Sequence, residues 1–209
     1  MTFEIEGGSS CVIVGPSGSG KTTLLNIVGL LDRVTAGRLY FGDLEVGALD
    51  ETQAAVVRNE WLGFVFQSAN LLPRYSLSEN VALPLLYRGV ARDARELSAT
   101  SALAQVGLGG YEDRLPSQLS AGQRQRVAVA RALVGAPRII LADEPTGNLD
   151  RSTASSIVDL FLTLSRESHV TVLMVTHDEG LASLCDQRIE MVDGCLSRQG
   201  CGSAGRSGR

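Results

Sequence analysis

The stretch GPSGSGKTT, at residues 15–23, decides the fold of this chain. The short apolar run SCVIV (residues 10–14) precedes it and predicts a buried strand, while residues 24–31 follow with helical spacing. The pattern GxxxxGK(S/T) is matched by Gly15, Gly20, Lys21 and Thr22. A strand, a glycine-rich loop and a helix in this order predict a loop that binds phosphate groups.

The residue types in this loop explain how it would hold a polyphosphate. Glycines let the backbone wrap around the phosphates with its N–H groups inward, and the following helix adds its positive N-terminus. Lys21 is the only lysine of the 19 basic residues, and its compact ammonium suits the β/γ-phosphates, while the Thr22 hydroxyl suits Mg²⁺. We expect the following residues to form the cradle: Gly15, Pro16, Ser17, Gly18, Ser19, Gly20, Lys21, Thr22 and Thr23.

The composition limits the class of protein. With 209 residues, 44% hydrophobic and 20% charged, the chain has the balance of a soluble globular protein, and no apolar stretch approaches the ~18–20 residues of a membrane span. The start has no signal-peptide pattern, and the four cysteines form no CxxC pair, so we expect a reduced, cytoplasmic protein. The net charge of −4 favours a protein with no nucleic-acid partner.

The order of the remaining patterns predicts an α/β core with a helical insertion. Apolar runs predict strands at residues 61–66, 138–142, 170–175 and 188–192, with a hairpin at 38–46 around Gly42. Helical spacing predicts helices at 92–106, 121–134, 151–166 and 178–185, and an apolar run after Ser78 that Pro84 would kink or end. The expected parts are the core (1–67 and 137–196), the helical insertion (68–136) and a disordered tail (197–209).

Two acidic residues follow an entirely apolar strand. In RIILADEP, Asp143 and Glu144 come directly after residues 138–142. Ligands bind open α/β sheets at the carboxyl ends of the strands, where an aspartate can hold Mg²⁺ and a glutamate can polarise an attacking water. The alternative is a pair of solvated acids at the start of a loop, which the phosphate loop makes the weaker interpretation.

The segment PSQLSAGQRQRV (residues 116–127) predicts a helix start that can bind an anion. Ser120 is a good N-cap, and Ala121 and Gly122 leave backbone N–H groups open at the positive end of the helix. Taken alone, an ordinary capped helix is the more frequent explanation of such a segment. We expect the arginines of this helix to be solvated: Arg124, Arg126 and Arg131.

Two further polar residues follow predicted strands. His177, in VTHD, comes after residues 170–175 and can donate a hydrogen bond to a γ-phosphate, although a purely structural histidine is about equally frequent. Gln67 comes after residues 61–66, and its alternative is a plain polar residue at a strand boundary.

In this order the sites resemble those of the ATPase subunit of ABC transporters. GPSGSGKTT resembles the Walker A loop, Gln67 in FVFQ the Q-loop, and LSAGQ (residues 119–123) the family signature. IILADE resembles Walker B, GNLD (147–150) the D-loop, and His177 the switch histidine. The similarity covers about residues 2–197 and is greatest to the bacterial branch with lipoprotein-release and macrolide-export ATPases.

The resemblance implies a fold and an assembly. The fold is α/β of the P-loop NTPase (RecA-like) type, with a parallel sheet core, an inserted helical subdomain and a small antiparallel β part. Two subunits, as a homodimer or a heterodimer with a related ATPase subunit, would pair head to tail around two ATP molecules with Mg²⁺. The residues that would touch nucleotide across the pair are Ser120, Ala121, Gly122 and Gln123, with Asp150 as a link between the subunits.

The resemblance also implies catalytic roles and a membrane partner. Glu144 would be the general base and His177 the γ-phosphate contact, while Thr22, Gln67 and Asp143 would serve Mg²⁺. Gln67 would pass the state of the nucleotide to a transmembrane permease subunit through the helical insertion. The chain would then lie in the cytoplasm, peripheral on the inner face of the cell membrane, and drive export or lipoprotein release.

Two features depart from the family pattern. Ala121 stands where glycine is usual, so we expect reduced activity. Only 14 residues precede Gly15, where the family has an earlier strand and an aromatic residue against adenine, and Phe3 alternates with Ile5 as a core residue would. The alternative interpretation is therefore a nucleotide-binding module with little turnover, or a truncated fragment of such a subunit.

The helical insertion carries apolar residues that a lone soluble domain has little reason to display. We expect them to form an exposed docking surface for the permease, with packing inside the insertion as the alternative. They are Leu71, Leu72, Leu83, Leu85, Leu86 and Tyr87.

Overall fold

The computed structural model describes residues 1–201, and its centre is a six-stranded sheet in the order β4-β5-β6-β1-β7-β8. All neighbouring strands are parallel except β7 and β8, which are antiparallel. The strands are β1 (Ser10–Val14), β4 (Leu62–Phe66), β5 (Ile139–Asp143), β6 (Thr171–Thr176), β7 (Gln187–Val192) and β8 (Cys195–Cys201). The parallel core strands lie within one residue of the ranges that the apolar runs predicted.

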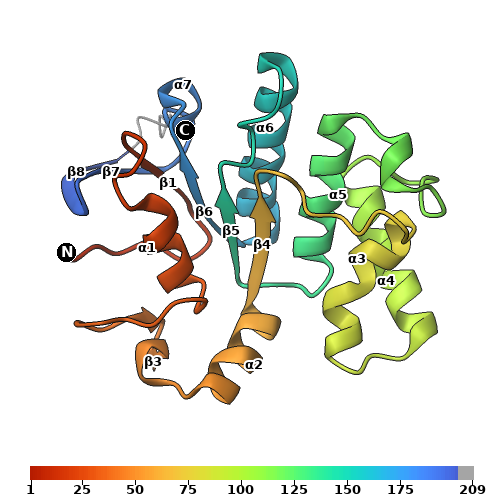
Figure 1. Cartoon of the computed structure of the whole chain (residues 1–209), viewed down its shortest axis with the longest axis horizontal. Coiled ribbons are helices and arrows are strands. Elements are labelled where there is room, and N and C mark those ends of the chain that lie inside the picture. The colour runs from red at the N-terminus through yellow and green to blue at the C-terminus, as the bar shows by residue number, and fades with distance from the viewer. Residues whose placement is uncertain (202–209) are drawn as a thin grey trace, which may run out of the picture.

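Helices cover both faces of this sheet, which explains why its central strands β1, β5 and β6 are almost entirely apolar. On β1, Val12 and Val14 belong to one buried cluster together with residues of α5 (Ala121–Leu133) and α6 (Arg151–Ser168). The alternate residues Cys11 and Ile13 belong to a second cluster with α1 (Lys21–Val28). Figure 1 shows α1 and α6 on either side of the strands. The carboxyl ends of β1, β5 and β6 therefore meet at one edge between these layers.

Three helices of the insertion lie together beside β4 (Figure 1). They are α3 (Leu77–Tyr87), α4 (Arg92–Gln105) and α5, and α3 is joined to β4 by a long loop. Pro84 lies inside α3 and does not end it. The helix continues to Tyr87 and buries residues on both sides of the proline, Val81 before it and Leu85 after it, and this burial opposes the loss of the hydrogen bond that proline removes.

Smaller elements complete the chain between the main strands. The predicted hairpin is present as β2 (Tyr40–Phe41) and β3 (Leu44–Glu45), and α7 (Glu179–Ala182) is shorter than the helix expected there. Helix α2 (Glu51–Trp61) was not predicted. Its start is nevertheless visible in the sequence, because Asp50 and Gln53 have the spacing of a capping box, which they form in the structure. Two 3-10 turns lie at Val46–Ala48 and Pro116–Gln118.

The prediction of disorder from residue 197 is wrong for its first part. Strand β8 runs to Cys201 and pairs with β7 along its length. The turn between the two strands is Asp193-Gly194, both with positive φ, the two-residue turn that joins twisted antiparallel strands. The sequence pair Asp-Gly was the signal for this hairpin. The rest of the expected tail, residues 202–209, lies outside the described residues.

The N-terminal segment packs on the sheet as its alternation indicated. Phe3 and Ile5 are half-buried and pack against the cluster that contains α1. Among residues 1–201, no helix is long and apolar enough to cross a membrane.

Candidate nucleotide site

The glycine-rich loop lies between β1 and α1 and has a backbone that only glycine permits at two points. Gly20 is the N-cap of α1 with φ +95°. A Cβ on Gly15 would lie 2.0 Å from the carbonyl oxygen of Met191, on β7. The backbone N–H of Gly194 also donates to the carbonyl of Ser19 at 3.0 Å, so the end of the β7–β8 hairpin packs against the loop.

Lys21 is buried under this loop and closes it. Its Nζ donates to the carbonyl oxygens of Gly15 and Pro16, at 2.8 Å each. The hydroxyl of Ser19 is buried and has no hydrogen-bond partner, although buried hydroxyl groups in proteins are normally hydrogen-bonded. The Lys21 ammonium, the Ser19 hydroxyl and the N-terminus of α1 all belong to this loop and the helix that follows it. Together these donors fit a polyphosphate, which supplies many acceptor oxygens.

Thr22 and Asp143 meet where a cation would bind beside the phosphates. The Thr22 hydroxyl donates to Asp143 Oδ1 at 3.2 Å, across the ends of α1 and β5. Burial raises the pKa of Asp143, an effect that the hydrogen bond from Thr22 opposes. A carboxylate that is partly stripped of water gains a partner when a hard cation such as Mg²⁺ arrives, so this pair fits the metal.

Glu144 and His177 form the second contact at this edge. Glu144 Oε2 lies 2.7 Å from His177 Nδ1, and the histidine follows the end of β6. Glu144 has φ +47°, which non-glycine residues rarely adopt, and its backbone N–H donates to the carbonyl of Val175 on β6 at 3.0 Å. The bond to β6 holds the carboxylate beside the histidine, in a position to accept a proton from water.

Gln67 reaches the loop that follows these acids. Its Nε2 donates to Asn148 Oδ1 at 3.5 Å, and Asn148 Nδ2 donates to the carbonyl of Gln67 at 3.4 Å. Gly147 lies so close that a Cβ there would be 2.6 Å from Gln67 Nε2. Sequence reasoning named Gln67 but gave Asn148 no part, because nothing in the spacing showed that β4 and β5 are neighbours.

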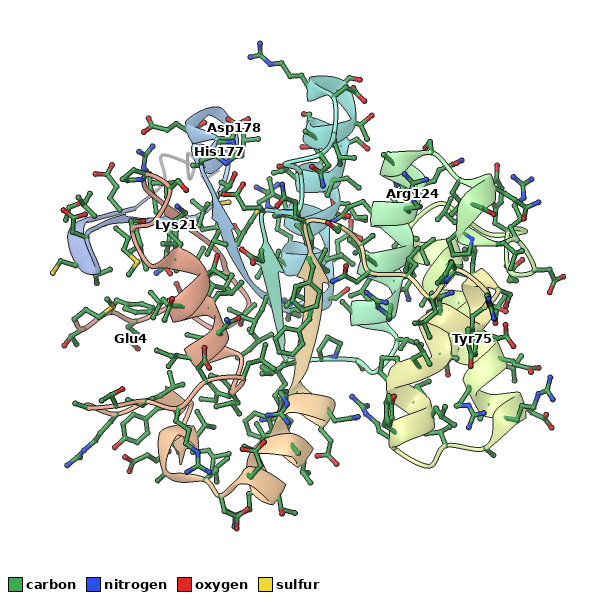
Figure 2. The ribbon with its side chains drawn as sticks, viewed as in Figure 1. Glu4, Lys21, Tyr75, Arg124, His177 and Asp178 are labelled. Carbon is green, nitrogen blue, oxygen red and sulfur yellow. The ribbon has the colours of Figure 1, made fainter. Side chains whose placement is uncertain are left out.

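The N-terminus of α5 is formed as predicted but lies apart from this edge. Ser120 Oγ accepts from the backbone N–H of Gln123 at 3.2 Å, and Gln123 Oε1 accepts from the N–H of Ser120 at 3.0 Å. A Cβ on Gly122 would lie 2.4 Å from Thr153 Cγ2, which explains the glycine there. Figure 2 shows Arg124 of this helix on the insertion, across the sheet from Lys21 and His177.

Asp150 caps α6 and has a local partner for both carboxylate oxygens. It accepts from the hydroxyls of Ser152 and Thr153 at 2.6 Å each, and from their backbone N–H groups. These hydrogen bonds hold the pKa of Asp150 well below its usual range. Its carboxylate is therefore ionised at neutral pH, at the exposed end of α6.

The expectation that the arginines of α5 are solvated is wrong. All three are half-buried, and each guanidinium donates to one or two backbone carbonyls near α5. Arg124 donates to Leu119, Arg126 to Val106, and Arg131 to both Ala69 and Asn70.

The expected docking surface is only partly exposed. Leu85 is buried and Leu83 is half-buried, because the helical phase of α3 turns them inward, while Leu71, on the loop before α3, packs against the main core cluster. Three of the six remain exposed: Leu72 at 40%, Leu86 at 49% and Tyr87 at 79%. Tyr75, on the loop before α3, is also exposed, at 46%, and the sequence analysis did not single it out.

Comparison with known proteins agrees with this site. A profile of the family described as ABC transporter matches residues 1–147. The lipoprotein-releasing system ATP-binding protein LolD of Bordetella avium is 47% identical over 94% of this chain and 85% of its own length. The macrolide export ATP-binding/permease protein MacB of Rhodopirellula baltica is 45% identical over 94% of this chain, which spans 29% of that longer protein.

Solved structures give the same result. A dimeric ATP-binding cassette in a post-hydrolysis state, bound to ADP and Pi, superposes with a TM-score of 0.86 and 39% identity. The match covers 97% of this chain and 89% of that one. The phosphate loop, the acids after β5 and these matches lead to one conclusion: the chain belongs to the ABC transporter family and is an ATPase that uses ATP and Mg²⁺.

Proposed function

We propose that this chain is the ATP-hydrolysing half of a head-to-tail pair, formed with a second copy or with a related ATPase subunit. The supporting observation is a separation within one chain: Lys21 and His177 lie at one edge, and the open N-terminus of α5 lies across the sheet (Figure 2). A second chain in the opposite orientation would bring its Ser120, Ala121 and Gly122 to the phosphates that Lys21 holds. The dimeric cassette with ADP and Pi supports such a pair.

The residues at the edge would then act on bound ATP in distinct ways. Lys21 leaves its loop carbonyls for the β/γ-phosphates, and Thr22 and Asp143 hold Mg²⁺, which neutralises phosphate charge. Glu144 accepts a proton from the attacking water, and His177, 2.7 Å from it, orients the carboxylate and the γ-phosphate. Gln67 completes the Mg²⁺ site from the end of β4.

Asp150 would lie at the contact between the two chains. Its carboxylate is ionised and exposed at the N-terminus of α6, beside the Thr153 side chain that packs on Gly122. The helix starts of α5 and α6 therefore present one continuous surface to a partner chain.

The helical insertion, residues 68–136, would act as a subdomain that receives a transmembrane permease subunit. The exposed residues Leu72, Tyr75, Leu86 and Tyr87, called here the docking surface, lie on α3 and on the loop that leads to it from Gln67. A short apolar helix of the permease fits such a surface. The chain would then lie on the inner face of the cell membrane, and its relatives favour lipoprotein release or export as the driven process.

The test is ATP hydrolysis by the purified chain and by Glu144→Gln. Removing the base should leave ATP binding intact and stop phosphate release, and ATP should then trap a dimer that size-exclusion chromatography resolves. Phosphate release by Glu144→Gln at the parent rate would show that the base is another residue. A monomer at every ATP concentration would refute the paired site.

A further inference from the structure

Helix α5 holds the loop after β4 on both sides of Gln67. The Gln125 side chain, which is 2% exposed, donates from Nε2 to the carbonyl of Phe66 at 3.0 Å. Arg131 donates from Nη2 to the carbonyl of Ala69 at 2.6 Å and from Nη1 to that of Asn70 at 2.8 Å. The residues just before and just after Gln67 are therefore tied to one helix.

The loop has a backbone that needs such support. Ala69 and Asn70 have φ of +54° and +49°, two consecutive non-glycine residues in the left-handed region. L residues rarely adopt this conformation, and it persists only where the surroundings hold it. The guanidinium of Arg131 binds the carbonyls of these two residues, so its planar fork fixes the turn that aims Gln67 at Asn148.

The same helix begins at the residues proposed to touch the partner's nucleotide. Its first turn contains Ala121 and Gly122, while Gln125 and Arg131 lie further along the same rigid element. Burial lowers the pKa of Arg131, yet an arginine stays charged at neutral pH, so its fork can bind two carbonyls permanently. A shift of α5 must therefore move the backbone on either side of Gln67.

We propose that Gln125 and Arg131 are positioning residues that keep Gln67 in register with the N-terminus of α5. This inference rests on the proposed function, since it makes one helix connect the two places where the chain meets nucleotide. Neither residue touches ATP. They act through the backbone of residues 66–70, so their loss should misplace Gln67 without weakening the grip of Lys21 on the phosphates.

The experiment compares Arg131→Gln and Gln125→Met with Arg126→Gln in the full-length chain. Arg126 is the matched control, because it lies on the same helix, is half-buried, and donates to Val106 and Ser156 away from the loop. In the first two variants kcat should fall ~10- to 100-fold, as for other small misplacements of a catalytic group, with the KM for ATP within about twofold. Arg126→Gln should keep kcat within about twofold.

Hydrogen exchange of the peptide 66–72 gives a readout that needs no hydrolysis. Exchange should be at least about tenfold faster in Arg131→Gln and Gln125→Met than in the parent, and unchanged in Arg126→Gln. An equal fall of kcat in all three variants, or unchanged exchange in the first two, would overturn the proposal. If the parent itself does not hydrolyse ATP, the proposed function fails, and exchange still decides the inference. If Arg131→Gln does not fold, Gln125→Met decides it alone.

Discussion

Replacing Asn80 by alanine should loosen the part of the docking surface that precedes α3. Asn80 is fully buried, and its Oδ1 accepts from the backbone N–H of Leu72 at 2.7 Å. Its Nδ2 lies within hydrogen-bond distance of the carbonyls of Leu72, Tyr75 and Ser76, at 2.9–3.1 Å. One amide thus holds the whole segment that presents Leu72 and Tyr75 to solvent.

The magnitude follows from the hydrogen bonds that are lost. Nδ2 has two protons, so with Oδ1 about three bonds are lost, and at ~1 kcal/mol each Asn80→Ala should cost about 3 kcal/mol. For a chain of this size that lowers Tm by roughly 6–12 °C. If the loss stays local, the segment opens about 100-fold more often, which hydrogen exchange of residues 72–76 reports.

The assay is thermal unfolding with hydrogen exchange, beside Gln105→Ala, which truncates an exposed amide at the end of α4. The control should change Tm by no more than about 2 °C, because surface truncations usually change the free energy of unfolding by at most about 0.5 kcal/mol. An Asn80→Ala variant with the Tm and the exchange of the parent would show that these bonds do not hold the segment.

Three further predictions concern nucleotide, metal and permease. Lys21→Ala should abolish ATP binding at micromolar nucleotide with the fold retained, which titration and circular dichroism check; unchanged affinity would contradict it. Burial raises the pKa of Asp143, so the folded chain without nucleotide becomes less stable as pH rises through that pKa and the carboxylate ionises. Asp143→Asn should therefore raise the Tm of the nucleotide-free chain at pH 7 and remove stabilisation by Mg²⁺-ATP; a lower Tm without nucleotide would contradict this. Leu86→Asp and Tyr87→Asp should abolish co-purification with the permease at an unchanged soluble ATPase rate, whereas Leu85→Ala should lower Tm; retained co-purification would place the docking site elsewhere.

The sequence predicted the parts of the fold that repeat a strong pattern. The strands at 10–14 and 138–142 were found because they are apolar on both faces, as only a covered parallel strand is. Helix α2 and strand β8 were missed, since their signals are local: the pair Asp50 and Gln53, and the Asp193-Gly194 turn. A capping pair or a turn shows where a helix or strand begins. Whether that helix or strand is buried depends on residues that are far away in the sequence.

The sequence identified the residues of the candidate site but not the contacts that they make with one another. Thr22 and Asp143 were each assigned to Mg²⁺ from the sequence. In the fold, the Thr22 hydroxyl lies 3.2 Å from Asp143 Oδ1, because β1, which leads into α1, and β5 lie in the same sheet. The burial of Leu85 beside the exposed Leu86 depends on the phase of α3, which Pro84 obscured in the sequence. The role of Arg131 required knowledge that α5 packs under a loop 61 residues earlier, and no local pattern carries that information.

Mixing two inactive variants tests whether each nucleotide is held by Lys21 of one chain and the start of α5 of the other. Ala121→Glu puts a negative charge at an exposed position where it repels phosphate yet suits the helix N-terminus. Alone, Ala121→Glu and Lys21→Ala should both be inactive. Mixed in equal amounts, they should recover about a quarter of the parent rate, since half of the dimers then carry one intact site of two. A mixture no more active than its separate components would contradict the shared site.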